Sequence, residues 1–255
     1  MLPAKRRQYI MEELYTNQNV VVADLAEQMQ VTPMTIRRDI ELLEQSGLLE
    51  KTHGGAVLAE SSLKEVTYRQ RKTVCYEEKS AIAKAAAKLV KRGMCIYLDA
   101  GTTNYELARI LARQNHTLLT IVTNDLAIAQ ALMNVSNYKV IVLGGMVDPA
   151  SESVCGIHAA NMAAAFHYDI CFVGTQAITP EWQVMTVNAD KILLKQNYLK
   201  AASLKVLLAD STKFGKYKIY NICSALDFDM IISGKIFEST QLQALTDGGV
   251  KVVKV

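Results

Sequence analysis

The sequence predicts an α/β protein with two domains: a small winged helix-turn-helix unit followed by a larger, Rossmann-like α/β unit. Three observations carry this prediction. Residues 20–58 have the pattern of a short helix, a turn, a second helix and a hairpin tipped by glycine. Residues 76–255 alternate short apolar runs with helical segments, which is typical of a parallel sheet covered by helices. The polar stretch 59–75 between them is predicted as a linker, so the first domain comprises residues 1–58.

The first domain is expected to begin with three helices, at residues 4–15, 24–29 and 33–45. Thr32 is a good N-cap for the third helix, and Pro33 suits the first position after a cap. Within that helix, apolar residues recur at the spacing of one helical face and predict a buried stripe of Ile36, Ile40 and Leu43. The opposite face, which carries two adjacent arginines, is then expected to be exposed.

The exposed face of this third helix has residue types that read DNA. A recognition helix places its N-terminal residues against base edges, and the planar fork of arginine binds guanine or phosphate through two hydrogen bonds. Candidates for base contacts are therefore Met34, Thr35 and Arg38. Arg37 is a candidate for phosphate or base contact. The alternative is a solvated face on which the two arginines pair with Asp39 or Glu41, but the Thr-Pro start and the hairpin that follows favour DNA binding.

The predicted wing spans residues 48–58, with its turn at Gly54 and Gly55. Lys51 and His53 are placed there to contact phosphate, although His53 is equally consistent with a simple turn-flanking residue. The whole domain contains six basic and eight acidic side chains, so positive charge must be gathered on one face if DNA binds. The full set of predicted DNA contacts is Thr32, Met34, Thr35, Arg37, Arg38, Lys51 and His53.

In the second domain, apolar runs with the character of strands end in small polar residues. The runs and the polar segments after them are CIYL with DAGTTN, LLTIV with TND, KVIVL with GGM, DICFV with GTQ, and VLLA with DSTKFGK. A helix is expected at residues 77–90, and MIIS and VKVVKV suggest further strands. Because ligands bind at the carboxyl ends of the strands in open parallel sheets, these polar loops are expected to converge on one pocket.

The loop after the first of these strands is the strongest candidate for binding phosphate. Gly101 permits a close backbone approach, Thr102 and Thr103 offer hydroxyl donors, and the helix that begins there presents its N–H groups. A plain helix cap would use the same residues. In the second loop, side chains suited to sugar hydroxyls, or equally to an N-cap cluster, are Thr123, Asn124 and Asp125.

Six further residues are candidates for the same pocket: Asp99, Gly144, Gly145, Lys195, Asp210 and Lys213. For the two glycines the alternative is an ordinary turn. Lys195 lies on a predicted helix and could instead extend to solvent, as most helix lysines do. Asp210 and Lys213 could form a salt bridge within their own loop.

The stretch VTPMTIRRDIELLEQSGLLEKTHGGAV resembles the signature of DeoR-type bacterial repressors of sugar metabolism. Family members share a Thr-Ile-Arg-Arg-Asp helix and a His-Gly-Gly-Ala wing, which match Thr35–Asp39 and His53–Ala56. Lys51 stands where arginine is common, which keeps the cation but loses the bidentate geometry. In the second half, the family's motifs fall on Asp99–Thr103, Thr123 and Asn124, Gly144 and Gly145, Lys195, and Asp210–Gly215.

The resemblance implies a sensor domain related in fold to ribose-phosphate isomerases. It also implies a repressor of a carbohydrate-utilisation operon, controlled by a phosphorylated sugar or a related metabolite. The implied partners are double-stranded operator DNA, the sugar-phosphate effector and further copies of the chain in a dimer or tetramer. Asn104 stands where threonine is common, and Gln176 and residues 182–185 replace a more glycine-rich pattern. Because these departures lie near the expected pocket, they bear on which effector binds, and Asn104 and Gln176 join the candidates for effector binding.

A sugar-phosphate isomerase is the rival hypothesis for the second domain. Such an enzyme needs a carboxylate base beside the substrate carbon. Isomerase relatives carry an Asp-Gly-Ala-Asp type of loop, whereas Gly174–Thr179 here has no carboxylate and Glu181 lies beyond Pro180. The four histidines lack the spacing of metal ligands, and the phosphate-binding fingerprints of nucleotide enzymes are missing. We therefore expect no enzyme and no cofactor. A third possibility is a second domain that only assembles the protein.

Composition indicates an intracellular protein. The five cysteines are scattered without paired spacing, which is typical of a reducing compartment. Glu12 and Glu13 interrupt any apolar segment of a signal peptide, and no apolar run reaches about 18 residues. We expect a cytoplasmic protein without a membrane span.

Overall fold

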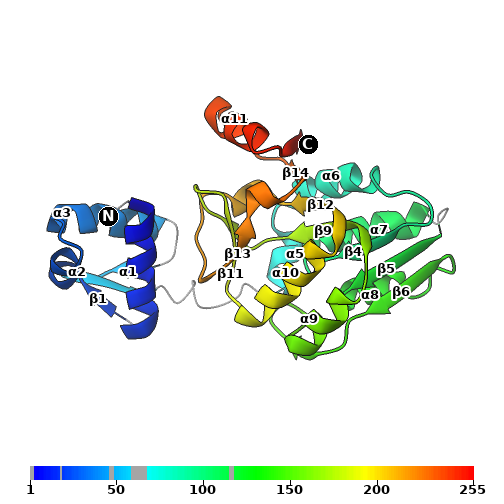
Figure 1. Ribbon diagram of the computed structural model, residues 1–255, viewed down its shortest axis with the longest axis horizontal. Coiled ribbons are helices and arrows are strands. Elements are labelled where there is room, and N and C mark those ends of the chain that lie inside the picture. Colours follow the sequence, from blue (N-terminus) through cyan, green and yellow to red (C-terminus); the bar gives the residue numbers. More distant parts are fainter. Residues whose placement is uncertain (1–2, 18, 46–48, 59–67, 115–117) are drawn as a thin grey trace.

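The computed structural model describes residues 3–17, 19–45, 49–58, 68–114 and 118–255 of the 255-residue chain. Two parts are visible in Figure 1, a small domain that holds the first three helices and a larger domain built around one long sheet. The predicted fold class is therefore confirmed. No helix among the described residues is long and apolar enough to cross a membrane.

The small domain packs three helices against a small antiparallel sheet. Its helices are α1 (Pro3–Asn17), α2 (Val22–Gln28) and α3 (Pro33–Gln45). Its strands are β1 (Asn19–Val21), β2 (Leu49–Lys51) and β3 (Gly55–Leu58), in the order β1-β3-β2. The buried stripe predicted on α3 is confirmed, because Ile36, Ile40 and Leu43 are at most 2% exposed. They pack with Ile10 and Leu14 of α1 in the core of this domain.

The wing differs from the prediction at Gly55. The hairpin turn lies at Thr52–Gly54, and Gly55 is already the first residue of β3. A Cβ atom added to Gly55 would lie 1.8 Å from the carbonyl oxygen of Val20 on the paired strand β1. Gly55 is therefore required because two backbones approach closely, and not because a turn needs its conformational freedom.

The larger domain is built on seven parallel strands in the order β15-β14-β12-β9-β4-β5-β6. The strands are β4 (Cys95–Leu98), β5 (Leu119–Thr123), β6 (Tyr138–Val142), β9 (Tyr168–Gly174), β12 (Ala202–Leu208), β14 (Met230–Ser233) and β15 (Lys251–Lys254). Each of the apolar runs singled out in the sequence is one of these strands. Central strands such as β9 read as continuous apolar runs because both faces of the sheet are covered.

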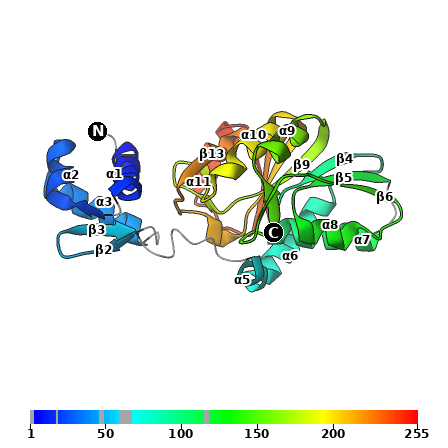
Figure 2. The same cartoon turned by 90° about the horizontal axis from the view of Figure 1, so that it is seen from below.

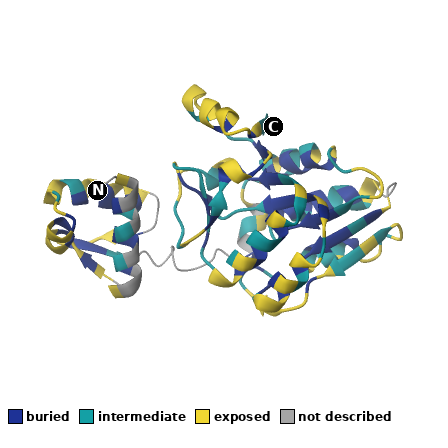
Figure 3. Cartoon of the chain, viewed as in Figure 1, coloured by how far each residue is buried: buried dark blue, intermediate teal, exposed yellow. Residues whose placement is uncertain are grey.

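Helices cover both faces of this sheet (Figure 2). On one face lie α6 (Tyr76–Ala87), α7 (Thr102–Gln114) and α8 (Leu126–Leu132). On the other lie α9 (Ile157–Ala164) and α10 (Ile192–Lys200). Each face has its own apolar core, with Ile82, Leu107 and Ile128 on the first face and Tyr97, Tyr168 and Tyr198 on the second. The last helix, α11 (Ser239–Asp247), stands apart and is largely exposed (Figure 3).

Two smaller sheets flank the main one. The first contains β10 (Ala177–Ile178), β11 (Gln183–Thr186) and β13 (Tyr220–Ser224). Its strands β11 and β13 lie on the side of the larger domain that faces α1 (Figure 1). The second is a hairpin of β7 (Met146–Asp148) and β8 (Ser153–Cys155). Short 3-10 helices occupy 189–191, 211–213 and 225–227.

The stretch expected to be a linker contains a helix, α5 (Tyr68–Thr73). Residues 59–67 of the same stretch lie outside the described residues. Tyr68 is 3% exposed, and its ring meets that of Tyr105 edge-on with centroids 6.4 Å apart. Its backbone N–H donates to the carbonyl of Ala150 at 3.1 Å. One buried aromatic therefore fixes α5 to the larger domain, although the composition around it is polar.

Candidate functional site

The main pocket lies where the strand order of the large sheet reverses. From β4 the chain adds β5 and β6 towards one edge, whereas β9, β12, β14 and β15 extend to the other. The connections that follow the carboxyl ends of β4 and β9 therefore lead towards opposite edges of the sheet. The crevice outside these strand ends is the usual place for a ligand in an open α/β sheet. Polar side chains that line this pocket are Arg71, Lys79, Asp99, Thr102, Thr103, Asn104, Asn124, Ser151, Thr175, Gln176, Thr186, Lys191, Lys195, Asp210 and Lys213.

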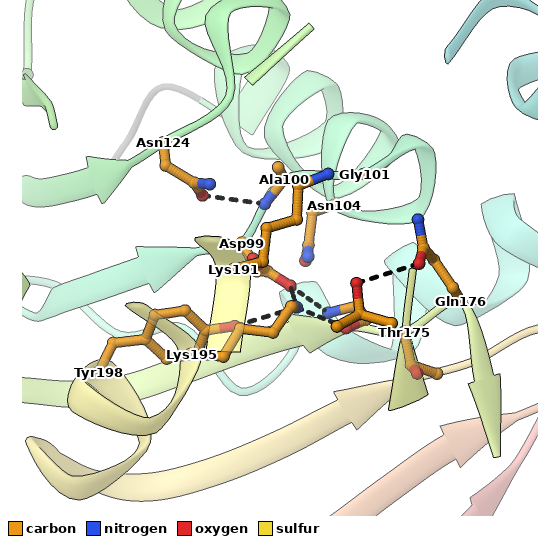
Figure 4. A network of polar contacts seen from close by, with 12 residues as sticks. Asp99, Ala100, Gly101, Asn104, Asn124, Thr175, Gln176, Lys191, Lys195 and Tyr198 are labelled. Atoms are coloured by element: carbon orange, nitrogen blue, oxygen red, sulfur yellow. Dashed lines mark hydrogen bonds and ion pairs between the residues drawn. The ribbon is translucent and has the colours of Figure 1, made fainter. Parts of the chain in front are cut away.

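Asp99 and Lys195 form a buried charge pair at the centre of this pocket (Figure 4). Asp99 is 2% exposed and Lys195 is 7% exposed. Besides the Asp99 carboxylate, the ammonium of Lys195 donates to the carbonyl of Gly174 at 3.0 Å and to the hydroxyl of Tyr198 at 3.2 Å. The backbone N–H of Gly174 donates to the same carboxylate at 3.0 Å. The pair therefore ties α10 to the ends of β4 and β9.

The loop after β4 is held by the loop after β5. The N–H of Ala100 donates to Asn124 Oδ1 at 3.1 Å, and the N–H of Gly101 donates to Asp125 Oδ2 at 3.0 Å. Asp125 also caps α8 by accepting from the N–H of Ile128 at 2.9 Å. Two backbone N–H groups of the predicted phosphate loop are thus already occupied within the chain.

The N-cap alternative describes this second loop best. Asn124 lines the pocket, whereas Thr123 and Asp125 lie behind it and are fully buried. The hydroxyl of Thr123 donates to the carbonyl of Leu98 at 2.7 Å. Burial raises the pKa of Asp125 to about 6, against the hydrogen bonds from the backbone.

The start of α7 lines the pocket with Thr102, Thr103 and Asn104. Thr102 and Thr103 are the first residues of this helix, whose first-turn N–H groups have no partner within the helix. Asn104 is fully buried, and its Nδ2 donates to the carbonyl of Phe172 at 3.2 Å. Its Oδ1 accepts no hydrogen bond from the described part of the chain. A buried acceptor of this kind suits a ligand hydroxyl.

Three cations line the same pocket as the first turn of α7: Arg71, Lys79 and Lys213. Lys79 is 2% exposed, and its ammonium donates to the backbone carbonyl of Arg71. Burial lowers the pKa of Lys79, the Asp210 carboxylate opposes that effect, and the charge of Lys213 adds to it. The pKa of Lys213 is lowered by burial in the same way, although Asp210 lies 3.8 Å away. The ammonium groups of Lys79 and Lys213 thus lie close to one carboxylate, and burial together with the charge of Lys213 lowers the pKa of Lys79, an arrangement that a bound anion would stabilise.

The remaining predicted residues have other positions. Gln176 lines the pocket, and its Oε1 accepts from the Thr186 hydroxyl at 3.1 Å and the Val187 N–H at 2.7 Å. Gly144 and Gly145 lie outside the pocket lining. A Cβ added to Gly145 would lie 2.7 Å from the carbonyl oxygen of Cys155, so a close packing contact explains that glycine.

Several cations in the pocket were not predicted from the sequence. Arg71 was assigned to the linker, and Lys79 was not singled out. Lys79 shares the buried face of α6 with Ile82, Ala83 and Ala86. A lysine in register with an apolar helical stripe was the signal that could have identified it. Lys191, also missed, pairs with Asp148 at 2.8 Å and donates to Ser151 at 2.8 Å.

The carboxylate considered for an isomerase lies elsewhere. Glu181 is on the turn between β10 and β11 and accepts hydrogen bonds from Tyr217 at 2.9 and 3.0 Å and from Arg7 at 2.9 Å. It is not part of the pocket lining. Within the described ranges, no cluster of three His, Cys, Asp or Glu side chains is arranged to hold a metal ion.

The predicted DNA-reading face of α3 is exposed. Met34 is 63% exposed, and Arg37 and Arg38 are also exposed. Neither arginine makes an ion pair in the part of the chain that the structure describes. Asp39 is instead buried and pairs with Arg6 and, at 3.7 Å, with Arg7 of α1. The alternative of a salt-bridged arginine face is therefore not what the structure shows.

A groove of about 160 Å³ between α3 and the wing brings Arg37, Lys51 and His53 together. Lys51 contacts Glu44 at 3.0 Å and Glu41 at 3.5 Å, so it would have to exchange these carboxylates for phosphate. Thr32 accepts the N–H of Thr35 at 3.3 Å and its hydroxyl lies 3.0 Å from that of Thr35. Thr32 thus acts as the expected N-cap of the recognition helix.

A polar cluster joins the two domains. Arg7 of α1 donates to Glu181 at 2.9 Å and lies 3.4 Å from the hydroxyl of Tyr217, and Tyr217 also packs on the core of the small domain. Glu181 precedes β11, which ends at the pocket residue Thr186. Tyr217 follows the pocket residue Lys213 by four positions. Two segments that line the pocket therefore also contact the DNA-reading domain.

Comparison with known proteins gives matches along most of the chain. The family description "DeoR-like helix-turn-helix domain" matches residues 6–62, and "DeoR C terminal sensor domain" matches residues 74–235. The HTH-type transcriptional regulator GolR of Listeria innocua is 34% identical over 99% of this chain and 98% of its own length. The glycerol-3-phosphate regulon repressor of Escherichia coli K12 is 28% identical over 97% of both chains. A ribose 5-phosphate isomerase from Methanocaldococcus jannaschii superposes with a TM-score of 0.41 at 20% identity, over 55% of this chain and 54% of that one.

Proposed function

Because this chain belongs to the DeoR family of transcriptional regulators, we propose that it represses a carbohydrate-utilisation operon under the control of a phosphorylated sugar or related metabolite. The matched relatives are named as regulators, which supports a role in transcription and not in catalysis. The operator is bound through α3 and the wing, with Arg38, Met34 and Thr35 towards base edges. The protein is proposed to be cytoplasmic, because operator DNA is accessible there.

The observation that carries the effector assignment is the cation cluster at the start of α7. Arg71, Lys79 and Lys213 all line the pocket there, and the Asp210 carboxylate lies close to Lys79 and Lys213. A phosphate ester bears about −1.5 to −2 charges at pH 7 and accepts hydrogen bonds through three oxygens. The first-turn N–H groups of α7 and the hydroxyl of Thr102 supply matching donors. The unpartnered Oδ1 of Asn104 then accepts from a hydroxyl of the carbohydrate.

The contact among Arg7, Glu181 and Tyr217 is the proposed link between effector and operator. When an anion draws Lys213 inward, the segment that leads to Tyr217 moves with it. Arg7 responds because its guanidinium lies between this segment and Asp39 of α3. A coupling of this type is typically about 1–3 kcal/mol, which is a change of about 5- to 150-fold in operator affinity.

The assembly is proposed to be a dimer or tetramer. An operator with two half-sites about one helical turn apart requires two DNA-reading domains. A region near the edge strand β6 exposes apolar side chains that suit contact with another copy: Met133 at 68%, Met146 at 56%, Val147 at 54% and Val142 at 39%.

Fluorescence anisotropy tests the proposal. The probes are labelled DNA segments taken from upstream of the genes that neighbour the gene for this protein. Wild-type protein should bind one segment specifically, and a phosphorylated sugar from a panel should release it. The matching unphosphorylated sugars serve as controls. Specific binding that no phosphorylated compound alters would contradict the effector assignment, and no specific binding to any segment would contradict the repressor assignment.

A further inference from the structure

Two buried side-chain oxygens of the pocket accept no hydrogen bond from the described part of the chain. They are Oδ1 of Asn104 and Oδ2 of Asp210. Asn104 is 0% exposed and Asp210 is 1% exposed, and both residues line the pocket. Amide and carboxylate oxygens can only accept, and a buried acceptor without a donor is costly. Both oxygens therefore suit donors that a ligand brings into the pocket.

Only one of the two carboxylate oxygens of Asp210 is satisfied within the described residues. Its Oδ1 accepts from the backbone N–H of Thr212 at 3.1 Å and from the hydroxyl of the same residue. The ammonium of Lys213 lies 3.8 Å from Oδ2, which is an ion pair but too long for a hydrogen bond. Its own loop thus fixes the orientation of Asp210 and leaves one oxygen for a ligand.

The two oxygens lie at the ends of neighbouring strands. Asn104 Nδ2 donates to the carbonyl of Phe172 on β9, and a Cβ added to Gly174, the last residue of β9, would lie 3.8 Å from that nitrogen. Asp210 comes two residues after Leu208, the last residue of β12, which pairs with Gly174. Neighbouring strands are about 4.8 Å apart, so one small ligand can reach both oxygens.

The charges around Asp210 favour an uncharged donor. Its carboxylate interacts with the ammonium groups of Lys79 and Lys213, which line the same pocket. These two cations would repel a ligand ammonium placed at Oδ2, and the Asp210 carboxylate would repel a ligand carboxylate, which also has no proton to donate. A hydroxyl carries no charge and donates one hydrogen bond, so it suits this oxygen.

We propose that the effector is a polyhydroxylated phosphate monoester in which a second hydroxyl, besides the one assigned to Asn104, donates to Oδ2 of Asp210. The proposal rests on the function proposed above, because it assigns a further part of the same ligand. Since the phosphate is placed beside Lys79 and Lys213, the hydroxyl at Asp210 belongs to the part of the ligand close to the phosphate. Asp210 then distinguishes sugar and polyol phosphates from phosphate esters without hydroxyls.

Isothermal titration of the full-length protein tests the proposal by comparing hydroxylated phosphate esters with methyl phosphate, which has the ester but no hydroxyl. The hydroxylated probes are glycerol 3-phosphate, ribose 5-phosphate, glucose 6-phosphate and fructose 6-phosphate. Methyl phosphate is measured directly and by displacement of the tightest of these. The quantity compared between proteins is the ratio of the dissociation constant of methyl phosphate to that of the tightest hydroxylated probe.

The variant Asp210→Asn keeps one oxygen that can accept from Thr212 and replaces the other oxygen by an NH₂ group, which cannot accept. It also removes a negative charge beside Lys79 and Lys213, which favours every phosphate ester, so the charge change alone cannot weaken a hydroxylated probe. Binding of methyl phosphate to the variant shows that its pocket is folded. The control is Asp247→Asn, at an exposed position at the end of α11 and outside the pocket lining.

We expect the tightest hydroxylated probe to bind more tightly than methyl phosphate to the wild type, and the ratio to fall about 10-fold in Asp210→Asn but not in Asp247→Asn. If the ratio is the same in Asp210→Asn as in wild type, or if no hydroxylated probe binds more tightly than methyl phosphate, the hydroxyl at Asp210 is wrong and the phosphate site stands. If neither methyl phosphate nor any hydroxylated probe binds, the effector assignment of the proposed function fails as well.

Discussion

The ammonium of Lys195 on α10 contacts the carboxylate of Asp99 at the end of β4, and both side chains are nearly inaccessible to solvent. This pair lines the pocket at the point where the order of the strands in the sheet reverses. Because Lys195 has its donors directed at Asp99, Gly174 and Tyr198, it organises the pocket and is not available as a mobile ligand contact. We therefore expect the two residues to contribute mainly to the stability of the folded domain.

The substitution Lys195→Met leaves Asp99 charged and buried without its partner. Removing one member of a buried pair typically costs about 3–5 kcal/mol, so we expect a loss of that size in the free energy of unfolding. Urea denaturation at neutral pH measures it, and Lys200→Met is the matched control. The double variant Asp99→Asn with Lys195→Met should recover part of the loss. A single variant as stable as wild type would show that the pair contributes nothing.

Arg38→Ala should abolish specific operator binding while the fold is kept, because the side chain is exposed on α3 and no ion pair of the described residues holds it. A bidentate base contact is typically worth about 1–3 kcal/mol of discrimination. Anisotropy with operator and scrambled DNA separates the specific from the non-specific component. Arg92→Ala, an exposed arginine of the larger domain, is the control. If the ratio of the two affinities is the same as in wild type, Arg38 does not read bases.

Glu181→Gln should weaken the coupling between the domains. The change keeps the size of the side chain but removes the charge that Arg7 contacts at 2.9 Å. We expect effector binding without DNA to be unaltered, and the ratio of operator affinities with and without effector to move towards one. Glu77→Gln, at an exposed position on α6, is the control. An unaltered ratio would remove this contact from the route of communication.

The pH dependence of the free energy of unfolding should reveal the raised pKa of Asp125. Its pKa is about 6 in the folded chain and 3.8 as an unperturbed side chain. The folded state therefore holds the proton more tightly, and stability falls as pH rises from about 4 to about 6, by roughly 3 kcal/mol from this group. Asp125→Asn removes that component while Asn can still accept from Gly101 or Ile128. If the difference in stability between variant and wild type is constant over this range, the carboxyl is not perturbed.

The sequence was most informative where periodicity and local chemistry decide the structure. The stripe of Ile36, Ile40 and Leu43 predicted which face of α3 is buried, and the small polar residues after each apolar run predicted the ends of β4 and β9. Both follow from contacts between near neighbours in sequence or from the period of an element.

The roles of several site residues could not be predicted, because they depend on contacts with residues distant in sequence. Thr123 and Asp125 look like ligand contacts until the structure shows them holding the loop at Gly101. Arg71 looks like part of a polar linker because the burial of Tyr68 that anchors α5 involves Tyr105. The cation cluster of the pocket arises only when segments near residues 71, 79 and 213 meet. Tertiary contacts of this kind have no local signature.

We propose that an anion bound at the start of α7 controls operator binding. The most direct test is an operator-release titration of wild type and Thr102→Val with the sugar phosphate that gives the largest thermal stabilisation. Thr102→Val keeps the shape of the side chain and removes one hydroxyl from the lining. We expect equal operator affinity without the sugar phosphate, and a concentration for release that rises about 3- to 10-fold in the variant. Release of both proteins at the same concentration would contradict it.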